Sequence, residues 1–410
     1  MDNARFLAVR SLIDTLEHGA YSNLELKRTL GHSDLSVGGR ALYKQLYFGT
    51  LERLRLLDFC LAQVSKMKLG KMSPLILNTL RVGAYGRYFT DFPAAKTVNE
   101  TVAILRKKAP NATGLANAIL RNLPPLPHDL SPAVRYSVSD EIYALLHQTL
   151  GEKTDAFLEQ ALTPAPITAR VNTCRTTAEE LIHILADQGV TATQASLPNA
   201  LHLSLSSALE TLPAYREGLF HLQGLSSQSA VALLDPKPDE VMLDLCCAPG
   251  GKAFTAAQYM NNRGHIYGFD LHEHRVGLIQ SGAARLGLSC ITAATADATA
   301  PLAVPQADAI LADVPCSALG QLSRRPELRY RNPDTASLTK VQAAILENAA
   351  QYLKAGGRLL YSTCTLNMEE NRGVRDRFLE HHPEFCIKAE VMPTDPHDGF
   401  YMTLLIKERS

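Results

Sequence analysis

The first third of the chain repeats apolar residues at the three- and four-residue spacing of amphipathic helices. Phe6, Val9, Ile13 and Leu16 share one such face, and Gly19 follows them as a helix stop. Residues 1–123 contain no run that alternates with the two-residue period of a strand. The pattern therefore predicts a bundle of helices.

Two boundaries inside this region carry local helix signals. Ser73 and Pro74 form an N-cap followed by proline at the first helical position, ahead of an apolar run from Leu75 to Tyr85. Thr97 and Glu100 have the spacing of a capping box. We expect helices to begin at both places.

The pattern changes after the proline-rich segment 124–127, which predicts a stiff linker. The sequence pattern of residues 136–163 predicts a helical stretch. A small α/β unit follows, with a strand from Ile167 to Val171, a helix from Thr177 to Gln188 and a half-buried strand from Leu201 to Leu205.

From about residue 215, short apolar runs alternate with helical stretches, as in parallel sheets covered on both faces. The predicted strands are 241–245, 265–270, 291–297, 309–313, 358–362 and 399–407, and the main predicted helices are 274–286 and 334–353. We therefore expect three domains: an all-α bundle over residues 1–125, linker helices with a small α/β subdomain over 126–214, and a doubly wound, Rossmann-like α/β sheet over 215–410.

Charge is distributed unevenly along a chain whose net charge is zero. Residues 1–123 hold 18 Lys and Arg against 9 Asp and Glu, and the remainder holds 23 against 32. A basic module of this kind is typical of proteins that bind nucleic acid. The alternative is that opposite charges dock the two halves of the chain together.

The composition also indicates where the protein is located and whether it binds a metal. No apolar run reaches the roughly 18 residues that cross a bilayer, and the start Met1-Asp2-Asn3-Ala4-Arg5 lacks the pattern of a signal peptide, so we expect a cytoplasmic protein without a membrane partner. Eight cysteines in 410 residues are too few for a disulfide framework, and none forms a CxxC pair. We expect reduced thiols and no metal site.

Acidic residues end successive predicted strands, where doubly wound sheets bind ligands: Asp244, Asp270, Asp297 and Asp313. A loop with Pro249, Gly250 and Gly251 follows the first of these strands, but it matches neither a dinucleotide fingerprint nor a P-loop. Asp270 suits the two hydroxyls of a ribose. Because the loop has no phosphate-binding motif, we expect the ligand to be a nucleoside rather than a nucleotide. S-adenosylmethionine is a ligand of this kind. The competing interpretation is that such residues only cap helices.

Two cysteines follow predicted strands, Cys316 in Asp-Val-Pro-Cys-Ser and Cys364 in Tyr-Ser-Thr-Cys-Thr. A pair of thiols beside a cofactor loop indicates covalent catalysis, in which one sulfur attacks and another group assists release. A lone cysteine after a strand is more often a small core residue. We expect such packing roles for the others: Cys60, Cys174, Cys290 and Cys386.

With these motifs the chain resembles the RNA (cytosine-5)-methyltransferases, most closely the bacterial 16S ribosomal RNA (cytosine-5)-methyltransferase B group. The resemblance rests on the loop from Asp244 to Lys252, the Pro-Cys and Thr-Cys motifs, and Glu369-Glu-Asn371. The N-terminal helices are similar to the NusB-like RNA-binding domain. Three positions depart from the usual pattern: Cys247 replaces alanine, Ala318 replaces glycine, and Gly224 replaces an aspartate.

The resemblance implies an S-adenosylmethionine-dependent methyltransferase with Cys364 as nucleophile. Cys316 would help break the covalent adduct, and Asp313 would face ring nitrogen 3 of cytosine. Lys252 would either favour the thiolate or only satisfy Asp244 or a helix end. The implied cofactor-binding residues are Cys246, Cys247, Ala248, Pro249, Gly250, Gly251, Lys252, Asp270, Asp297 and Asp313.

The expected partner is RNA, 16S ribosomal RNA by resemblance, with no DNA and a monomeric enzyme. Lys107 and Lys108 are candidates for backbone contacts, and the arginines at 324, 325, 329 and 331 are candidates for holding phosphates, although either group could simply be solvated. Two alternatives stay open. The enzyme could act on transfer RNA or another ribosomal position, or the chain could be a non-catalytic NusB-like RNA-binding protein.

Overall fold

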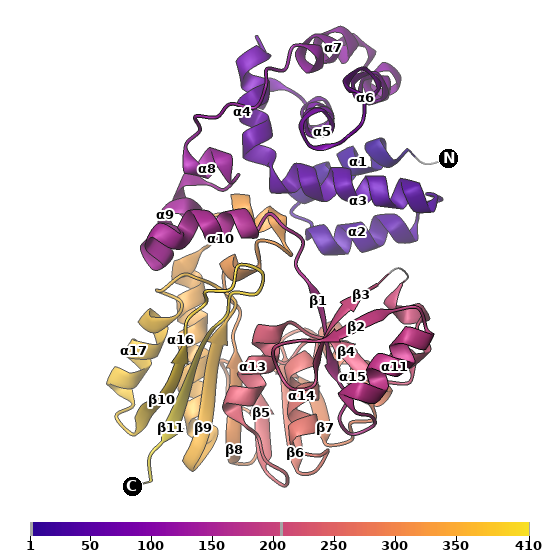
Figure 1. Cartoon of the computed structure of the whole chain (residues 1–410). Coiled ribbons are helices and arrows are strands. Elements are labelled where there is room, and N and C mark those ends of the chain that lie inside the picture. The colour runs from indigo at the N-terminus through magenta and orange to yellow at the C-terminus, as the bar shows by residue number, and fades with distance from the viewer. Residues whose placement is uncertain (1–2, 206–207, 410) are drawn as a thin grey trace. The chain divides into compact units, whose positions relative to one another are not determined.

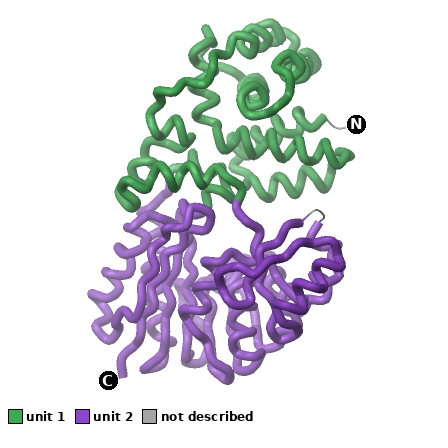
Figure 2. The backbone as a smooth tube through the Cα atoms, viewed as in Figure 1, with its two compact units in different colours: residues 1–164, 321–332 green, residues 165–320, 333–410 purple. Residues whose placement is uncertain are grey.

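The computed structural model describes residues 3–205 and 208–409 (Figure 1). Its contacts divide the chain into two compact units, coloured separately in Figure 2. Unit 1 comprises residues 1–164 and 321–332, and unit 2 comprises residues 165–320 and 333–410. The chain therefore passes from one unit to the other three times. The predicted domain boundaries after residues 125 and 214 stay predictions.

Unit 1 is built from helices: the described residues up to 164 form helices and no strand, in agreement with the predicted bundle. The α-helices are α1 (Ala4–Leu16), α2 (Ser22–Gly31), α3 (Val37–Glu52), α4 (Leu54–Val64), α5 (Pro74–Phe89), α6 (Ala94–Lys108), α7 (Thr113–Arg121), α8 (Pro132–Arg135), α9 (Asp140–Leu150) and α10 (Thr154–Gln160). Helix α5 begins as predicted, because the side chain of Ser73 accepts a hydrogen bond from the amide of Ile76.

The predicted capping box at Thr97 is wrong. Helix α6 already begins at Ala94, and the amide of Thr97 donates to the carbonyl of Pro93 at 3.0 Å, so Thr97 lies in the first turn and is buried. Proline before two alanines starts the helix earlier because its fixed φ suits an N-terminus. Glu100 instead pairs with Arg5 of α1 at 2.6 Å.

The predicted helical stretch 136–163 is interrupted. Helices α9 and α10 are separated at Gly151, which has a φ of +56°, a left-handed value that glycine adopts without strain. The break was not anticipated because the apolar spacing continues across it.

Segment 321–332 belongs to unit 1, although it follows the Pro-Cys motif in sequence. Arg329 is fully buried, and its guanidinium donates to the carbonyls of Tyr136 at 3.0 Å and Ala161 at 2.8 Å. A side chain held in this way has no access to a phosphate, so that prediction is wrong for Arg329. Arg331 donates to the carbonyl of Gly19 at 3.0 Å.

Unit 2 contains a small four-stranded sheet with the order β2-β3-β1-β4, in which neighbouring strands are antiparallel. Its strands are β1 (Ile167–Val171), β2 (Thr191–Gln194), β3 (Ala200–Ser204) and β4 (Phe220–Leu222), accompanied by α11 (Ala178–Asp187) and α12 (Pro213–Arg216). Helix α11 has a complete capping box between Thr177 and Glu180. The two predicted strands and the helix of this region are confirmed to within one residue.

The second sheet of unit 2 has seven strands in the order β10-β11-β9-β8-β5-β6-β7. The strands are β5 (Val241–Asp244), β6 (His265–Asp270), β7 (Ile291–Thr295), β8 (Ala307–Asp313), β9 (Leu353–Thr363), β10 (Phe385–Val391) and β11 (Tyr401–Lys407). Strands β5 to β9 pair in parallel, whereas β11 pairs antiparallel with both β9 and β10. The predicted doubly wound sheet is confirmed, with an antiparallel edge that the sequence pattern did not reveal.

Helices cover both faces of this sheet (Figure 1). They are α13 (Leu225–Leu234), α14 (Gly251–Tyr259), α15 (Glu273–Leu286), α16 (Thr335–Tyr352) and α17 (Arg372–His381). Successive strand residues point to opposite faces: Met242 packs with α13, α14 and α15, whereas Leu243 packs with α16 and α17. Among the described residues, no helix combines the length and apolar character that a bilayer crossing needs.

Candidate active site

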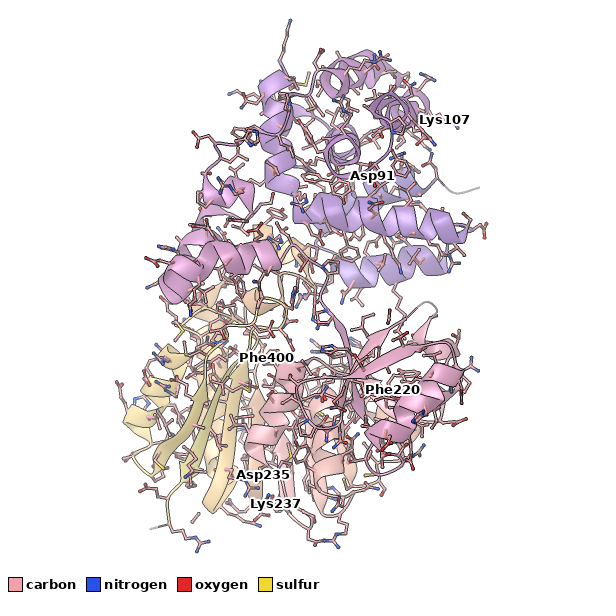
Figure 3. All side chains as sticks on the ribbon, viewed as in Figure 1. Asp91, Lys107, Phe220, Asp235, Lys237 and Phe400 are labelled. Atoms are coloured by element: carbon pink, nitrogen blue, oxygen red, sulfur yellow. The ribbon has the colours of Figure 1, made fainter. Side chains whose placement is uncertain are left out.

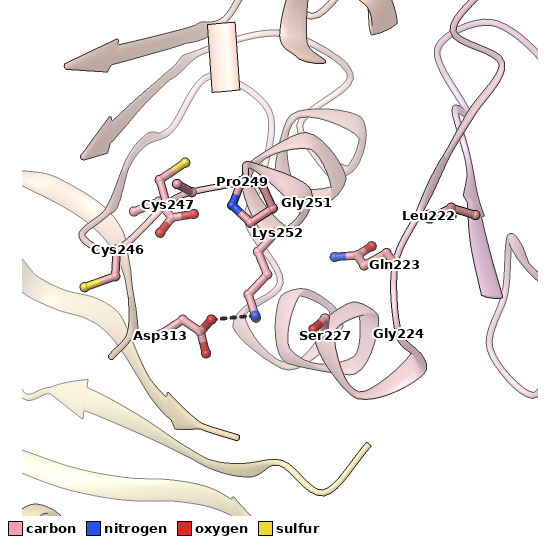
Figure 4. Close-up of a pocket in the computed structure, with 12 residues that line it drawn as sticks. Leu222, Gln223, Gly224, Ser227, Cys246, Cys247, Pro249, Gly251, Lys252 and Asp313 are labelled. Atoms are coloured by element: carbon pink, nitrogen blue, oxygen red, sulfur yellow. Dashed lines mark hydrogen bonds and ion pairs between the residues drawn. The ribbon is translucent and has the colours of Figure 1, made fainter. Parts of the chain in front are cut away.

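A cavity of about 200 Å³ lies beyond the carboxyl ends of β5 and β8 (Figure 4). Parallel strands bring their carboxyl ends to one edge of the sheet, which is where ligands bind in this architecture. Of the predicted cofactor residues, those that line the cavity are Cys246, Cys247, Ala248, Pro249, Gly251, Lys252 and Asp313. Asp244 lines it as well.

The loop between β5 and α14 makes one wall. Gly250 has a φ of +107°, and a Cβ there would lie 2.3 Å from the ring of Phe254, so only glycine fits. The amide of Gly250 donates to the carbonyl of Cys247 at 2.7 Å, which closes the turn. Burial raises the pKa of the Cys247 thiol, which therefore stays protonated.

Three predicted residues do not line the cavity: Gly250, Asp270 and Asp297. Asp270 is buried at the end of β6, where it accepts from the amide of His272 at 3.1 Å and pairs with Arg275 at 3.2 Å. Hydrogen bonds from the hydroxyl and amide of Thr299 lower the pKa of Asp297.

Asp244 is an unusual carboxylic acid. It is 1 % exposed, and neither oxygen accepts a hydrogen bond of normal geometry from the described residues. Burial, followed by repulsion from Asp313, raises the pKa of Asp244 to about 7. These two effects outweigh the opposing influence of Lys252, the Cys247 thiol and the Cys246 amide, which lower the pKa. A buried carboxyl group without a strong partner at a cavity wall is suited to receive a cationic ligand.

Lys252 contacts Asp313 rather than Asp244. Its Nζ lies 2.6 Å from Asp313 Oδ2 (dashed in Figure 4), and Ser362 Oγ donates to Asp313 Oδ1 at 2.8 Å. The ammonium also lies 4.8 Å from the ring centre of Phe400, the residue before β11 (Figure 3). Burial opposes the charge, but the charge and hydrogen bond of Asp313 prevail, so the pKa of Lys252 is raised and the side chain stays cationic.

The two motif cysteines lie side by side. Strands β8 and β9 pair in parallel with Asp313 opposite Ser362, so the turns that follow them are neighbours. Cys316 Sγ lies 3.3 Å from Cys364 Sγ, and the amide of Cys364 donates to Cys316 Sγ at 3.3 Å. The hydrogen bond to Cys364, together with burial, raises the pKa of the Cys316 thiol well above its usual range.

Glu370 holds both cysteine turns, a role that the sequence did not reveal. It is fully buried and accepts hydrogen bonds from the amide and hydroxyl of Ser317, next to Cys316, at 2.9 and 2.5 Å. The same Ser317 hydroxyl contacts that of Thr365, next to Cys364, at 2.6 Å. Its position in Glu369-Glu-Asn371 after the Thr-Cys motif was the available signal.

Asp398 occupies the space at Gly224, the position where the resemblance leads to the expectation of an aspartate. A Cβ on Gly224 would lie 2.3 Å from Asp398 Oδ2, and this oxygen accepts from the amide of Ser226 at 3.0 Å at the start of α13. The helix end is therefore capped by a carboxylate from elsewhere in the chain.

The departure at Ala318 has a cost. Its φ is +57°, in the left-handed region that favours glycine, so alanine is strained there.

The other cysteines divide into two pairs. Cys60 and Cys290 are buried as predicted. The packing role predicted for Cys174 and Cys386 is wrong, because both are exposed.

Comparison with known proteins identifies the family. Residues 231–403 match the family described as 16S rRNA methyltransferase RsmB/F. A probable ribosomal RNA small subunit methyltransferase B from Synechocystis sp. is 34% identical to this chain, over 94% of this chain and 91% of that protein. The chain belongs to the RsmB/F methyltransferase family. A probable ribosomal RNA small subunit methyltransferase B from Bacillus subtilis is 32% identical to this chain, over 93% of this chain and 89% of that protein.

The remaining parts have relatives too. Residues 2–124 match the NusB family, and residues 142–210 match the ferredoxin-like domain of RsmF/B-like methyltransferases. The crystal structure of PH0851 superposes with a TM-score of 0.82 at 25% identity, over 98% of this chain and 99% of that one.

S-adenosylmethionine is the methyl donor of this family, and the cavity fits it. The donor carries an α-ammonium group, for which the unpartnered Asp244 carboxyl offers an acceptor. The turn around Gly250 and Gly251 leaves the backbone open to close approach.

Proposed function

We propose that this chain methylates carbon 5 of a cytosine in 16S ribosomal RNA through a covalent bond between Cys364 and carbon 6 of the base. The observation that carries the proposal is the pair of thiols 3.3 Å apart, at the ends of neighbouring strands. Membership of a methyltransferase family and relatives named as ribosomal RNA small subunit methyltransferases support the class of reaction and the substrate.

The reaction needs a nucleophile because carbon 5 of cytosine reacts poorly with a methyl sulfonium. Addition of the Cys364 thiolate forms a sulfur–carbon 6 bond and makes carbon 5 nucleophilic, which divides one difficult step into two easier ones. S-adenosylmethionine supplies the electrophilic methyl group. Loss of the carbon 5 proton and cleavage of the sulfur–carbon bond then restore the aromatic ring and the Cys364 thiolate.

The surroundings of the two sulfurs support different roles for them. The hydrogen bond with Cys364, together with burial, raises the pKa of the Cys316 thiol, which makes Cys316 the less suitable nucleophile. The resemblance of the Thr-Cys motif assigns the attack to Cys364. For release, Cys316 first loses its own proton to water, and its thiolate then takes the proton from carbon 5 of the methylated base. The electrons of that carbon–hydrogen bond re-form the ring double bond and expel Cys364 from carbon 6. Asp313, fixed by Lys252 and Ser362, is assigned to ring nitrogen 3, where charge develops as sulfur adds.

Two alanine variants test this division of roles. Cys364→Ala should abolish transfer of labelled methyl groups to RNA, and a near wild-type rate would eliminate the covalent scheme. Cys316→Ala should accumulate a protein–RNA adduct that migrates slowly in a denaturing gel, and absence of the adduct would eliminate its role in release. Cys386→Ala, which removes an exposed thiol on β10, is the matched control and should retain full activity.

The target base must leave its stack, because a stacked cytosine hides carbon 6. Unpaired or distorted nucleotides are the usual sites of sequence-specific RNA recognition. The excess of basic residues in the NusB-like part, including the exposed Lys107 (Figure 3), supports contact with the RNA backbone. Bisulfite sequencing of ribosomal RNA from cells with and without the gene should show one cytosine whose protection is lost, and unchanged protection throughout would refute the 16S assignment.

A further inference from the structure

Gln223 presents a buried amide group to the cavity that the proposed mechanism does not use. The side chain lines the cavity and is 8 % exposed. Thr255 Oγ1 donates to Gln223 Oε1 at 2.6 Å, whereas Gln223 Nε2 is buried and has no hydrogen-bond partner among the described residues. The nitrogen points into the cavity (Figure 4). A buried amide without an acceptor is costly, so this donor indicates a ligand group.

The main chain and side chain of Gln223 are both held in place. Its amide donates to the carbonyl of Thr168 at 3.0 Å, and its carbonyl accepts from the Thr168 hydroxyl at 2.7 Å. Because Thr255 fixes the oxygen end of the side-chain amide, the nitrogen end is directed before any ligand arrives. Such preorganised donors bind without further loss of side-chain freedom.

Two features near Gln223 favour an anionic ligand group. Nε2 lies 3.8 Å from the position of a Cβ on Gly251, the first residue of α14, and the absence of that Cβ leaves room beside the helix start. The N-terminus of a helix carries partial positive charge and free amide donors. Asp244 on the same cavity offers an acceptor without a partner. A donor site and an acceptor site in one cavity match the carboxylate and ammonium of an α-amino acid.

We propose that Gln223 binds the carboxylate of the amino-acid end of the methyl donor, with Thr255 as the positioning residue that orients its amide. The inference rests on the proposed function only in placing S-adenosylmethionine in this cavity. It assigns Gln223 to recognition of one end of the donor, so that adenosyl compounds without a carboxylate gain nothing from it.

Isothermal titration of the full-length protein with two ligands tests the inference. S-adenosylhomocysteine retains the amino-acid end, and 5′-methylthioadenosine lacks it. Gln223→Met should weaken binding of S-adenosylhomocysteine about 10- to 100-fold, the range for a hydrogen bond to a charged group, and leave binding of 5′-methylthioadenosine unchanged. Equal weakening of both ligands, or no weakening of either, would overturn the inference.

Further variants separate ligand recognition from damage to the fold. Thr255→Val retains the side-chain volume and removes the hydroxyl, so it should weaken S-adenosylhomocysteine selectively but less than Gln223→Met; equal effects on both ligands would again count against the inference. Gln280→Met, on the exposed face of α15, is the matched control and should bind like wild type. If wild-type protein bound neither S-adenosylmethionine nor S-adenosylhomocysteine, the proposed function itself would fail, which is a distinct result.

Discussion

Replacement of Asp244 by asparagine tests the electrostatics at the centre of the cavity. The wild-type carboxyl group is 1 % exposed, with a pKa raised to about 7. In the unfolded chain its pKa is near the ordinary value of about 3.9. The folded protein therefore binds the proton more tightly, and the stability contributed by this group falls as the pH rises from about 4 to about 7. Above pH 7 the carboxyl group is ionised in the folded protein as well, and the full free-energy penalty for burying its charge is present.

The size of the penalty follows from the two pKa values. A shift of about three pH units corresponds to roughly 4 kcal/mol, at about 1.4 kcal/mol for each unit. Asparagine does not ionise, so the variant lacks this pH dependence. The cost of burying its amide is the same at every pH and does not affect the comparison.

Thermal unfolding without cofactor, measured between pH 5 and pH 8.5, provides the assay. The melting temperature of Asp244→Asn relative to wild type should rise with pH up to about 7 and then level off, with a total change of several degrees, at about 2–4 °C for each kcal/mol in a unit of this size. A difference that stays constant over this range would refute the raised pKa. Saturation with S-adenosylhomocysteine should reduce the pH dependence, because a ligand ammonium next to Asp244 favours its charged form.

Three further substitutions test particular contacts. Gly224→Asp, which introduces the residue expected from the family resemblance, should destabilise unit 2 by about 1–3 kcal/mol in urea unfolding, because the new side chain meets the Asp398 carboxylate; an unchanged midpoint would show that Asp398 moves aside freely. Ala318→Gly should stabilise the protein by about 0.5–1 kcal/mol by relieving the left-handed backbone, and a lower melting temperature would contradict the strain. Arg329→Met should cost about 2–4 kcal/mol, because two buried carbonyls lose a charged donor, and calorimetry showing no loss would contradict this account.

The central strands of the seven-stranded sheet, β5, β6, β8 and β9, could be predicted because each contains a short apolar run that is largely buried. Strands β2 and β4 of the smaller sheet were missed because they have only four and three residues, and β2 has no buried residue. Strand β10 escaped notice because its residues at 386–388 are exposed at the sheet edge and leave no apolar run. The early start of α6 was missed because the Thr97 and Glu100 spacing fits a capping box as well as it fits a helix interior.

The candidate site was predictable where the chemistry is encoded in local motifs. The Pro-Cys and Thr-Cys motifs could be paired because parallel strands end at one sheet edge. The role of Asp398 beside Gly224 could not be predicted, because the two are brought together only by the tertiary fold. Gln223 was missed for a similar reason: glutamine has many uses, and only its missing hydrogen-bond partner distinguishes it.

The position of residues 321–332 in unit 1 has a consequence for protein engineering. A fragment that begins at residue 165 would retain this stretch without the carbonyls of Tyr136 and Ala161, to which Arg329 donates. Its guanidinium would lose its docking site only 13 positions after Cys316. The methyltransferase half is thus incomplete when excised by a single cut, and a minimal catalytic version requires that stretch to be redesigned or the helical half to be supplied in trans.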